Sequence, residues 1–258
     1  MIIDIEGTDG CGKKTQTDLL FKFLTEKGYK VRKISFPNYE SNSSTLVKMY
    51  LSGEFGENAN DINGYQASTL YAVDRFATMS KINIANYDFI LFDRYVPSNM
   101  IHQSTRIKDQ QELDAFLDWI EDFEYGKLNL PKPDKTLFLD VPIEISMKLA
   151  RAREELKNGE SKDIHERDDN HLINAYEKAK YVAKKFDWLV IDCSNGESIK
   201  TIDEIHQDIL TKLNLKWYNK LRKKKELLWN LSLQVKNWEK NGWIFIKNVV
   251  TLIAVRYL

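Results

Sequence analysis

The stretch that decides the fold is Gly7-Thr8-Asp9-Gly10-Cys11-Gly12-Lys13, which lies between a predicted strand at 2–6 and a predicted helix at 13–27. The spacing Gly-x-x-x-x-Gly-Lys in this context is typical of a phosphate-binding P-loop. Glycines let backbone N–H groups turn towards one anion, and the helix N-terminus adds its dipole. Lys13 then places a charge between the β- and γ-phosphates of a nucleotide. We therefore expect a nucleotide site here, rather than a glycine-rich turn alone.

The residue after Lys13 departs from the usual pattern. A Ser or Thr hydroxyl normally binds Mg²⁺ there, whereas this chain has Lys14, followed by Thr15. Thr15 lies about 100° further round the helix, so it cannot simply replace the missing hydroxyl. Because Mg²⁺ keeps several waters and is also held by phosphates, we expect weakened metal binding, with ATP bound by residues 7–15. The alternative is a degenerate, inactive loop.

Outward from this loop, short apolar runs alternate with helical stretches as far as residue 215. The predicted strands are 2–6, 30–35, 88–92, 136–139 and 188–191, and we expect the last three to be buried. Longer predicted helices are 13–27, 67–82 and 112–123. This alternation predicts parallel βαβ units. The expected fold class is α/β: a three-layer αβα sandwich around a five-stranded parallel sheet of the P-loop NTP hydrolase type, with a helical C-terminal extension.

Composition indicates a soluble globular protein, because 43% of the residues are hydrophobic and 29% are charged. No apolar run reaches the roughly 20 residues that cross a bilayer, and the first residues lack the pattern of a secretory signal. The two cysteines, Cys11 and Cys193, lack metal-ligand spacing. Cys11 is interpreted as a small loop residue, although a helix N-terminus could lower its pKa. We expect a cytoplasmic location.

The last 43 residues differ in composition from the rest. Residues 216–258 carry a formal charge of +8 and four of the six tryptophans, whereas residues 1–215 carry −8. We therefore predict a nucleotide-binding domain at 1–215 and a basic, Trp-rich extension of unknown role at 216–258. Basic and aromatic residues together could suit nucleic acid or an anionic membrane. The favoured interpretation is that the tail packs on the body of the protein or is an accidental C-terminal extension, with no firm indication of either partner.

Asp93-Arg94-Tyr95 follows the predicted strand at 88–92. A carboxylate at the end of a central strand beside a P-loop lies where a Walker-B Asp holds the Mg²⁺ hydration shell, so Asp93 is the candidate metal residue. Arg94 is placed to clamp a phosphate with its planar fork. A structural salt bridge is the alternative for this pair.

Two further features have open interpretations. Tyr71 and Arg75 share a helix face and could contact a base, although taken alone Tyr71 is better read as a core residue and Arg75 as reaching the surface. The charged stretch at 157–171 is either a solvated loop or part of a mobile lid at about 152–170.

Four stretches in this order and spacing resemble the thymidylate kinases over about residues 1–213. They are residues 6–16, Phe36-Pro37, residues 70–75 and residues 93–98. The resemblance implies phosphoryl transfer from Mg-ATP to dTMP, giving ADP and dTDP in dTTP synthesis, by a homodimer. The alternatives are a kinase of another nucleotide or deoxynucleoside, and a catalytically silent ATP-binding protein anchored through its tail.

The resemblance also implies roles for individual residues. Asp9 would face the deoxyribose 3′-OH, Tyr71 would stack on thymine and Arg75 would bond the base edge. Arg94 would hold the dTMP phosphate and Asp93 would assist Mg²⁺. The remaining acceptor-pocket residues would be Phe36, Pro37, Ser98 and Gln103.

The resemblance further implies an arginine for the transferring phosphoryl group, and this P-loop contains none. Family members carry an arginine in the P-loop or in the lid, so here Arg151, Arg153 or Arg167 would act with Lys13 as catalytic residues. Two departures from the family pattern fall at positions that are expected to contact phosphates. Tyr39 stands where an arginine is frequent, and the lid reads Asp163-Ile164-His165-Glu166 without its usual arginine, with Lys162 nearby.

Overall fold

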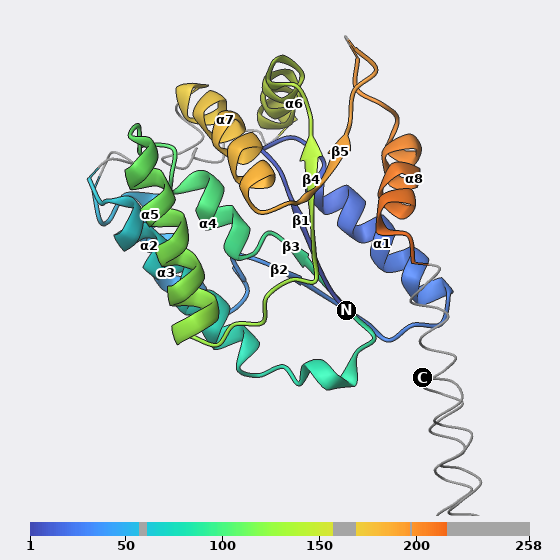
Figure 1. Cartoon of the computed structure of the whole chain (residues 1–258), viewed down its shortest axis with the longest axis horizontal. Helices are drawn as coiled ribbons and strands as arrows, with labels where there is room; N and C mark the ends of the chain where they lie inside the picture. Colours follow the sequence, from blue (N-terminus) through green and yellow to red (C-terminus); the bar gives the residue numbers. More distant parts are fainter. Residues whose placement is uncertain (57–60, 157–168, 197, 216–258) are drawn as a thin grey trace, which may run out of the picture. The chain divides into compact units, whose positions relative to one another are not determined.

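The computed structural model describes residues 1–56, 61–156, 169–196 and 198–215. A five-stranded sheet of order β2-β3-β1-β4-β5 lies at the centre of the compact unit Met1–Lys212 (Figure 1). Every strand pairing in it is parallel. The strands are β1 (Ile2–Glu6), β2 (Val31–Ser35), β3 (Phe89–Asp93), β4 (Lys135–Asp140) and β5 (Leu189–Asp192). All five predicted strands are confirmed to within one residue at each end.

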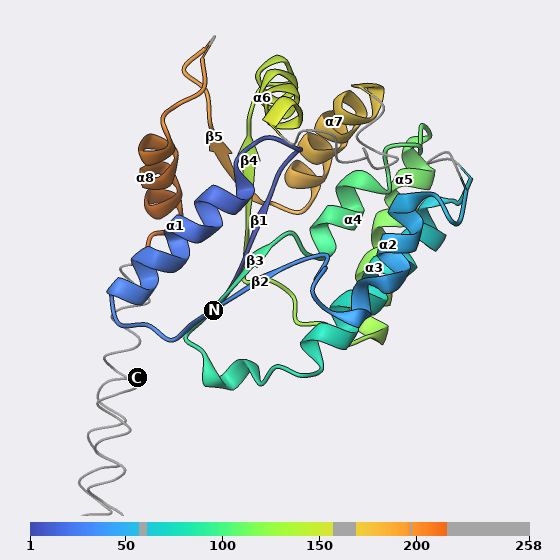
Figure 2. The same ribbon diagram turned by 180° about the vertical axis from the view of Figure 1, so that it is seen from behind.

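Helices cover both faces of the sheet (Figures 1 and 2). One face carries α1 (Lys13–Glu26) and α8 (Ile202–Leu213). The other face carries α3 (Gly64–Met79), α4 (Val96–His102), α5 (Gln110–Ile120) and α7 (Asp169–Lys185), with α2 (Thr45–Ser52) against α3. α6 (Ile143–Leu156) follows β4, and shorter turns are η1 (Asn42–Ser44), η2 (Ile84–Asn86) and the π-helix η3 (Glu121–Lys127). The predicted three-layer αβα sandwich is confirmed.

Side-chain caps set where two of these helices begin. Asn63 accepts a hydrogen bond from the backbone N–H of Gln66, and the Gln66 side chain accepts one from Asn63 in return, which is a capping box. α3 therefore begins three residues before the predicted start at 67. In the same way the Asp109 side chain accepts from the N–H of Glu112 and starts α5.

The strand β5 differs from its prediction. The run 188–191 is expected to be buried, yet Val190 is 39% exposed and only Ile191 in this strand is fully enclosed. The reason is its place in the sheet: β5 pairs with β4 alone and forms an edge. Apolar content alone does not distinguish an edge strand from a central one.

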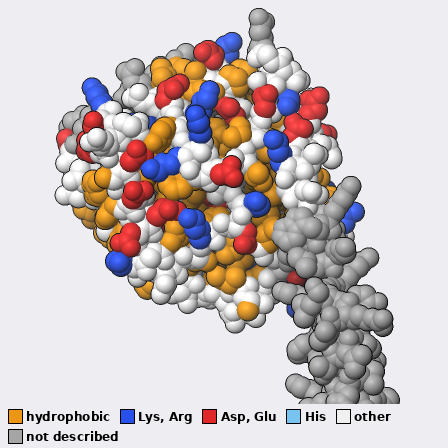
Figure 3. All heavy atoms as spheres, in the orientation of Figure 1, with side chains coloured by type: hydrophobic (Ala, Val, Ile, Leu, Met, Phe, Trp, Pro, Cys, Tyr) orange, Lys and Arg blue, Asp and Glu red, His pale blue; other side chains and the backbone are white. Residues whose placement is uncertain are grey.

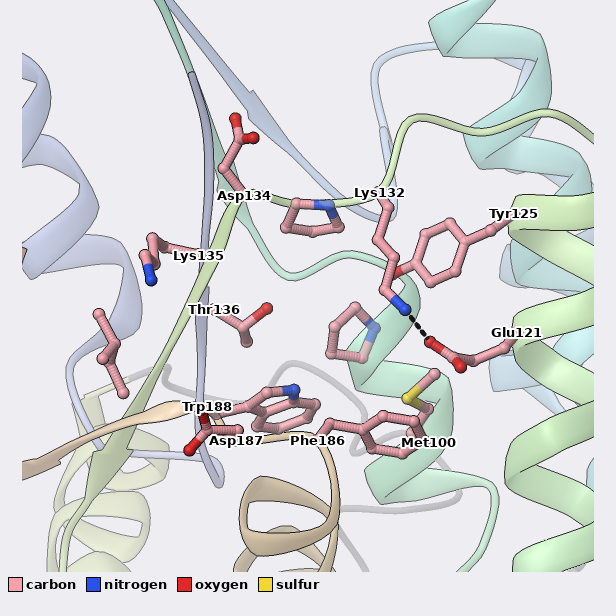
Figure 4. Close-up of a pocket in the computed structure, with 13 residues that line it drawn as sticks. Met100, Glu121, Tyr125, Lys132, Asp134, Lys135, Thr136, Phe186, Asp187 and Trp188 are labelled. Atoms are coloured by element: carbon pink, nitrogen blue, oxygen red, sulfur yellow. Dashed lines mark hydrogen bonds and ion pairs between the residues drawn. The ribbon is translucent and has the colours of Figure 1, made fainter. Parts of the chain in front are cut away.

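A cavity of about 120 Å³ lies at the amino ends of β4 and β5 (Figure 4). Tyr125 of η3 and Trp188 are among its aromatic lining residues, and Lys132 forms an ion pair with Glu121 at its rim. The P-loop follows the carboxyl end of β1, so in a parallel sheet this cavity lies at the opposite end of the strands. None of the predicted site residues line it.

The surface seen in Figure 3 mixes hydrophobic side chains with charged ones of both signs. Within the described ranges, no helix is both long and apolar enough to span a membrane. The predicted extension at 216–258, with its helical character and its basic, Trp-rich composition, falls outside the described residues, and so do residues 157–168 of the predicted lid. Those two assignments, and the domain boundary at 215, stay predictions.

Candidate nucleotide and acceptor site

The loop between β1 and α1 turns through three glycines with positive φ: Gly7 at 152°, Gly10 at 82° and Gly12 at 88°. A Cβ atom at Gly7 would lie 2.6 Å from the Cys11 Sγ and 3.0 Å from the carbonyl oxygen of Leu139, so a side chain does not fit. Gly12 caps α1 in the left-handed conformation that glycine adopts without strain. The loop thus has the backbone geometry expected of an anion-binding turn.

Lys13 lies inside this loop and is only 7% exposed. Its ammonium donates hydrogen bonds to the carbonyl oxygens of Gly7 at 2.9 Å and Thr8 at 2.7 Å. Within the described residues it forms an ion pair with no carboxylate, so its charge stays available to an anion. The Cys11 Sγ lies 3.7 Å away. Burial raises the pKa of the Cys11 thiol, which reverses the lowering that a helix N-terminus alone would produce.

Lys14 and Thr15 are both exposed on the first turn of α1. The Lys14 side chain is 72% exposed, and its ammonium lies 2.8 Å from Asp18. Neither residue therefore supplies a buried oxygen to the loop. Lys14 thus occupies the sequence position of the usual Ser or Thr, but its side chain supplies no hydroxyl for a metal ion.

Asp93 is the carboxylate that could hold Mg²⁺. It ends β3 and pairs in register with Ile5 of β1, directly before the P-loop. Among the described residues, no group of three or more His, Cys, Asp or Glu side chains could hold a metal ion. One carboxylate together with phosphate oxygens and water is nevertheless a common Mg²⁺ environment. The residues present therefore fit a hydrated Mg²⁺ held jointly with a nucleotide.

Arg94 joins the loop to α4. Its backbone has a φ of 67°, uncommon outside glycine. The guanidinium forms an ion pair with Asp9 of the P-loop. Nη1 lies 2.9 Å from the His102 Nε2 and 3.4 Å from the Ser98 Oγ. Asp9, Arg94 and Ser98, all predicted site residues, are thus brought together. His102 was not predicted, although it lies one helical turn after Ser98.

Glu6, like His102, is a residue of this site for which the sequence pattern predicts no role. Its buried carboxylate accepts hydrogen bonds from the Ser98 Oγ at 2.8 and 2.9 Å and from the backbone N–H of Tyr95 at 2.9 Å. Burial raises the pKa of Glu6, and the nearby charge of Arg94 opposes that shift. An acidic residue at the end of an otherwise apolar strand is the signal that could have found it.

Tyr71 and Arg75 lie on α3, as predicted. Tyr71 is half-buried, edge-on to Tyr50 at a centroid distance of 6.3 Å. The interpretation that Arg75 reaches the surface is wrong, because it is 1% exposed. Its Nε and Nη2 donate to the two carboxylate oxygens of Glu124 at 2.6 and 2.7 Å, and its Nη1 donates to the Tyr95 carbonyl at 3.3 Å. Glu124 was not predicted.

The other acceptor-pocket candidates are buried or half-buried. Phe36 is buried, and Pro37 precedes a segment held to α3, since Asp74 accepts a hydrogen bond from the Asn38 backbone at 2.8 Å. Gln103 is buried at the end of α4, and its Oε1 has no hydrogen-bond partner among the described residues. The contact of these residues with a substrate stays a prediction.

The predicted catalytic arginines Arg151 and Arg153 belong to α6, but their side chains fall outside what the structure describes, as does all of Arg167. The described part of α6 does contact the loop. The Ser146 Oγ lies 3.1 Å from the Thr8 Oγ1, and both side chains are buried.

A glycine nest, an enclosed lysine and a strand-end carboxylate meet at the carboxyl edge of a parallel sheet, which defines the P-loop nucleotide-binding class. A comparison with known families narrows this. The family model described as thymidylate kinase matches residues 5–209. The chain therefore belongs to the thymidylate kinase family and is an enzyme of the kinase class.

Individual relatives agree with this placement. A thymidylate kinase from Mycobacterium tuberculosis is 33% identical over 171 residues, covering 65% of this chain and 78% of that protein. One from Plasmodium falciparum is 26% identical over 210 residues, covering 81% and 87%. The solved structure of thymidylate kinase from Candida albicans aligns with a TM-score of 0.61 and 22% identity, over 85% of this chain and 92% of that one. At that identity the structural likeness supports the fold alone.

Proposed function

We propose that this protein transfers the γ-phosphoryl group of Mg-ATP to dTMP, giving ADP and dTDP for dTTP synthesis. The observation that carries the proposal beyond family membership is the ion pair between Arg94 and Asp9. This pair supports the proposal, because Arg94, the proposed phosphate-binding residue, lies next to the loop whose Lys13 is enclosed by backbone carbonyls. In the proposal, the donor site and the acceptor-phosphate site adjoin at one edge of the sheet.

At the donor end, the backbone N–H groups of residues 7–15 and the side chain of Lys13 bind the ATP phosphates. Lys13 exchanges its carbonyl contacts for β- and γ-phosphate oxygens, which are stronger, charged acceptors. Asp93 would hold Mg²⁺, which neutralises charge on the phosphates when bound. Arg151 and Arg153 are the proposed cations for the transferring group.

At the acceptor end, Arg94 holds the dTMP phosphate so that one of its oxygens lies in line with the γ-phosphorus. Asp9 faces the 3′-OH, Tyr71 stacks on thymine and Arg75 bonds the base edge. The pocket is completed by Phe36, Pro37, Ser98 and Gln103. Such a reaction needs little covalent help from the protein, so positioning and electrostatics carry the rate.

One observation favours a second candidate, a catalytically silent ATP-binding protein. Lys14 supplies no hydroxyl to the metal position and points to Asp18 on the surface. The experiment that separates the two measures ADP release with Mg-ATP and each deoxynucleoside monophosphate or deoxynucleoside in turn. The proposal predicts turnover with dTMP well above the others. ATP binding without turnover on any acceptor would support the silent protein instead.

A homodimer is part of the proposal. Val73 and Phe76 lie three residues apart on α3 and are 41% and 48% exposed, an apolar pair that a second copy would cover. The mass in solution tests this: Phe76→Glu should convert a dimer to a monomer, and a monomeric wild type would contradict it. We also propose a cytoplasmic location, which is compatible with Cys11 and Cys193 being free thiols.

A further inference from the structure

The ion pair between Arg75 and Glu124 is the most enclosed charge pair described in this molecule. Arg75 comes from α3 and Glu124 from the π-helix η3, 49 residues later. Their side chains are 2% and 0% exposed. Both carboxylate oxygens are used, at 2.6 and 2.7 Å, so the pair is bidentate and holds the guanidinium plane in one orientation.

This pairing determines what Arg75 can still bind. A guanidinium has five N–H groups in a rigid fork. Glu124 takes those of Nε and one of Nη2, and one on Nη1 donates to the Tyr95 carbonyl at 3.3 Å. One N–H of Nη1 and one of Nη2 remain, and that of Nη2 lies on the edge away from Nε, because its other N–H pairs with Glu124 beside Nε. Because Glu124 already compensates the positive charge, that edge suits a neutral carbonyl oxygen better than it suits a phosphate.

Glu124 also orients a neighbouring side chain from a third element. The Asn99 Nδ2 donates to the Glu124 Oε1 at 2.9 Å and to the Ser68 carbonyl at 3.1 Å. Both of those oxygens only accept hydrogen bonds, so the amide nitrogen must face them. The Asn99 carbonyl oxygen is thereby directed away from Glu124. One carboxylate thus sets the orientation of two side chains, on α3 and on α4.

We propose that Glu124 is a positioning residue for base selection, which aims the remaining donor edge of Arg75 at a neutral carbonyl of the base. The inference rests on the proposed function, in which Arg75 bonds the base edge. Thymine presents a carbonyl oxygen at its 4-position, where cytosine presents an amino group. A donor edge held in this way accepts the first and rejects the second, because two opposed donors leave buried polar groups unpaired.

Stability alone is a weak reason for this arrangement. Buried ion pairs are frequently replaced by apolar residues with no loss of stability, so a pair of this kind is poor evidence for a purely structural role. The experiment must therefore separate base preference from folding.

The test is the steady-state phosphorylation of dTMP and dCMP by the full chain carrying Glu124→Gln. We expect the KM for dTMP to rise about tenfold to a hundredfold, the size typical of losing an outer partner of a binding residue. We expect kcat to change less than about threefold and the KM for ATP to stay constant. The preference for dTMP over dCMP, as a ratio of kcat/KM values, should fall at least about tenfold.

Two matched variants control for folding. Leu117→Ala removes a buried apolar side chain from the preceding helix and should lower the melting temperature while keeping both Arg75 and Glu124. Glu121→Gln breaks the more exposed ion pair with Lys132 in the same π-helix as Glu124. Both variants should keep the wild-type preference. Loss of preference in Leu117→Ala as large as in Glu124→Gln would reduce Glu124 to a structural residue and overturn the inference.

Should Glu124→Gln fail to fold, Glu124→Asp replaces it. The shorter side chain keeps the charge but withdraws the carboxylate, so the dTMP preference should fall at least about threefold. If the dTMP preference is unchanged in either variant, the role of Glu124 is overturned. The proposed function is not, since wild type would still phosphorylate dTMP. A wild type that does not phosphorylate dTMP would overturn the proposed function instead.

Discussion

The phosphate end and the base end of the proposed site hold their cations differently. Lys13 is surrounded by backbone carbonyls, and Arg94 pairs with Asp9, whose side chain is 51% exposed. Arg75 is instead enclosed with a carboxylate that has no exposure at all. Phosphates carry charge and need cations that can change partner, whereas a base is neutral and needs a donor in a fixed direction. The comparison therefore links the environment of each cation to the chemistry of its proposed partner.

Removing the positive charge of Lys13 from the P-loop should have the largest effect on activity. We expect Lys13→Ala to lower kcat by about a thousandfold, because one preorganised charge at the transferring group is lost. Coupled ADP release measures it, with Lys14→Ala as the control one residue away, expected within about threefold of wild type. Similar losses in both variants would show that the loop is damaged generally and would break the comparison.

The second-largest effect is expected on the stability of the fold, when the enclosed ion pair between Arg75 and Glu124 is broken. Glu124→Ala leaves the Arg75 charge buried without its carboxylate, so we expect a loss of about 3 kcal/mol in the free energy of unfolding. Asp9→Ala breaks the exposed pair with Arg94, and we expect a change of less than about 1 kcal/mol. Urea unfolding measures both. Equal losses in the free energy of unfolding would contradict a difference in burial between the two ion pairs.

A pH-dependent effect on stability should follow at Asp4, in the middle strand β1 of the sheet. Its side chain is fully buried, and neither carboxylate oxygen has a hydrogen-bond partner among the described residues. Burial, and then the charges of Glu6 and Asp93, raise the pKa of Asp4 well above its usual value. Folding therefore takes up a proton. The stability contributed below the unfolded pKa declines as pH rises towards the folded pKa, by about 1.4 kcal/mol per unit.

The asparagine in Asp4→Asn carries no charge at any pH, so the variant does not lose stability in this way as the pH rises. We expect the variant to gain stability relative to wild type between pH 4.5 and pH 7.5, measured by urea unfolding at both. Asp114→Asn is a control whose effect should not change between these pH values, since hydrogen bonds from Lys185 and Tyr181 lower the pKa of Asp114 to about 2 and its contribution to stability is lost only at lower pH. A gain at Asp4 that does not depend on pH would show that its carboxyl is charged in the folded protein.

The smallest effect is expected at the metal position. Lys14→Ser restores the usual hydroxyl at an exposed position, since the lysine side chain is 72% exposed and pairs with Asp18 on the surface. We expect the Mg²⁺ concentration for half-maximal rate to fall about threefold, since phosphates and water supply most ligands. A gain from no activity to full activity would instead identify the natural chain as catalytically silent.

The parts of this site predicted from sequence are those encoded locally. The P-loop, its flanking strand and helix, and the pair Asp93-Arg94 depend on residues next to one another, and each occurs where the pattern places it. Helix boundaries are less well predicted, as at α3, because a cap at Asn63 decides them.

The parts that sequence did not predict depend on distant pairings. The partner of Arg75 is Glu124, 49 residues later, which reaches it only in the folded chain. Glu6 and His102 acquire their contacts in the same way, through α4. The exposure of β5 depends on strand order, which no single strand encodes. Local pattern therefore finds the phosphate end of the site better than the base end.

The most direct test of the account measures products rather than binding. Purified full-length protein is incubated with Mg-ATP and dTMP, and the ADP and dTDP formed are quantified by chromatography. We expect both products in equal amounts, with dTDP lost in Lys13→Ala. ADP without dTDP would show an ATPase, no ADP would show a silent nucleotide-binding protein, and either result would contradict phosphoryl transfer to dTMP.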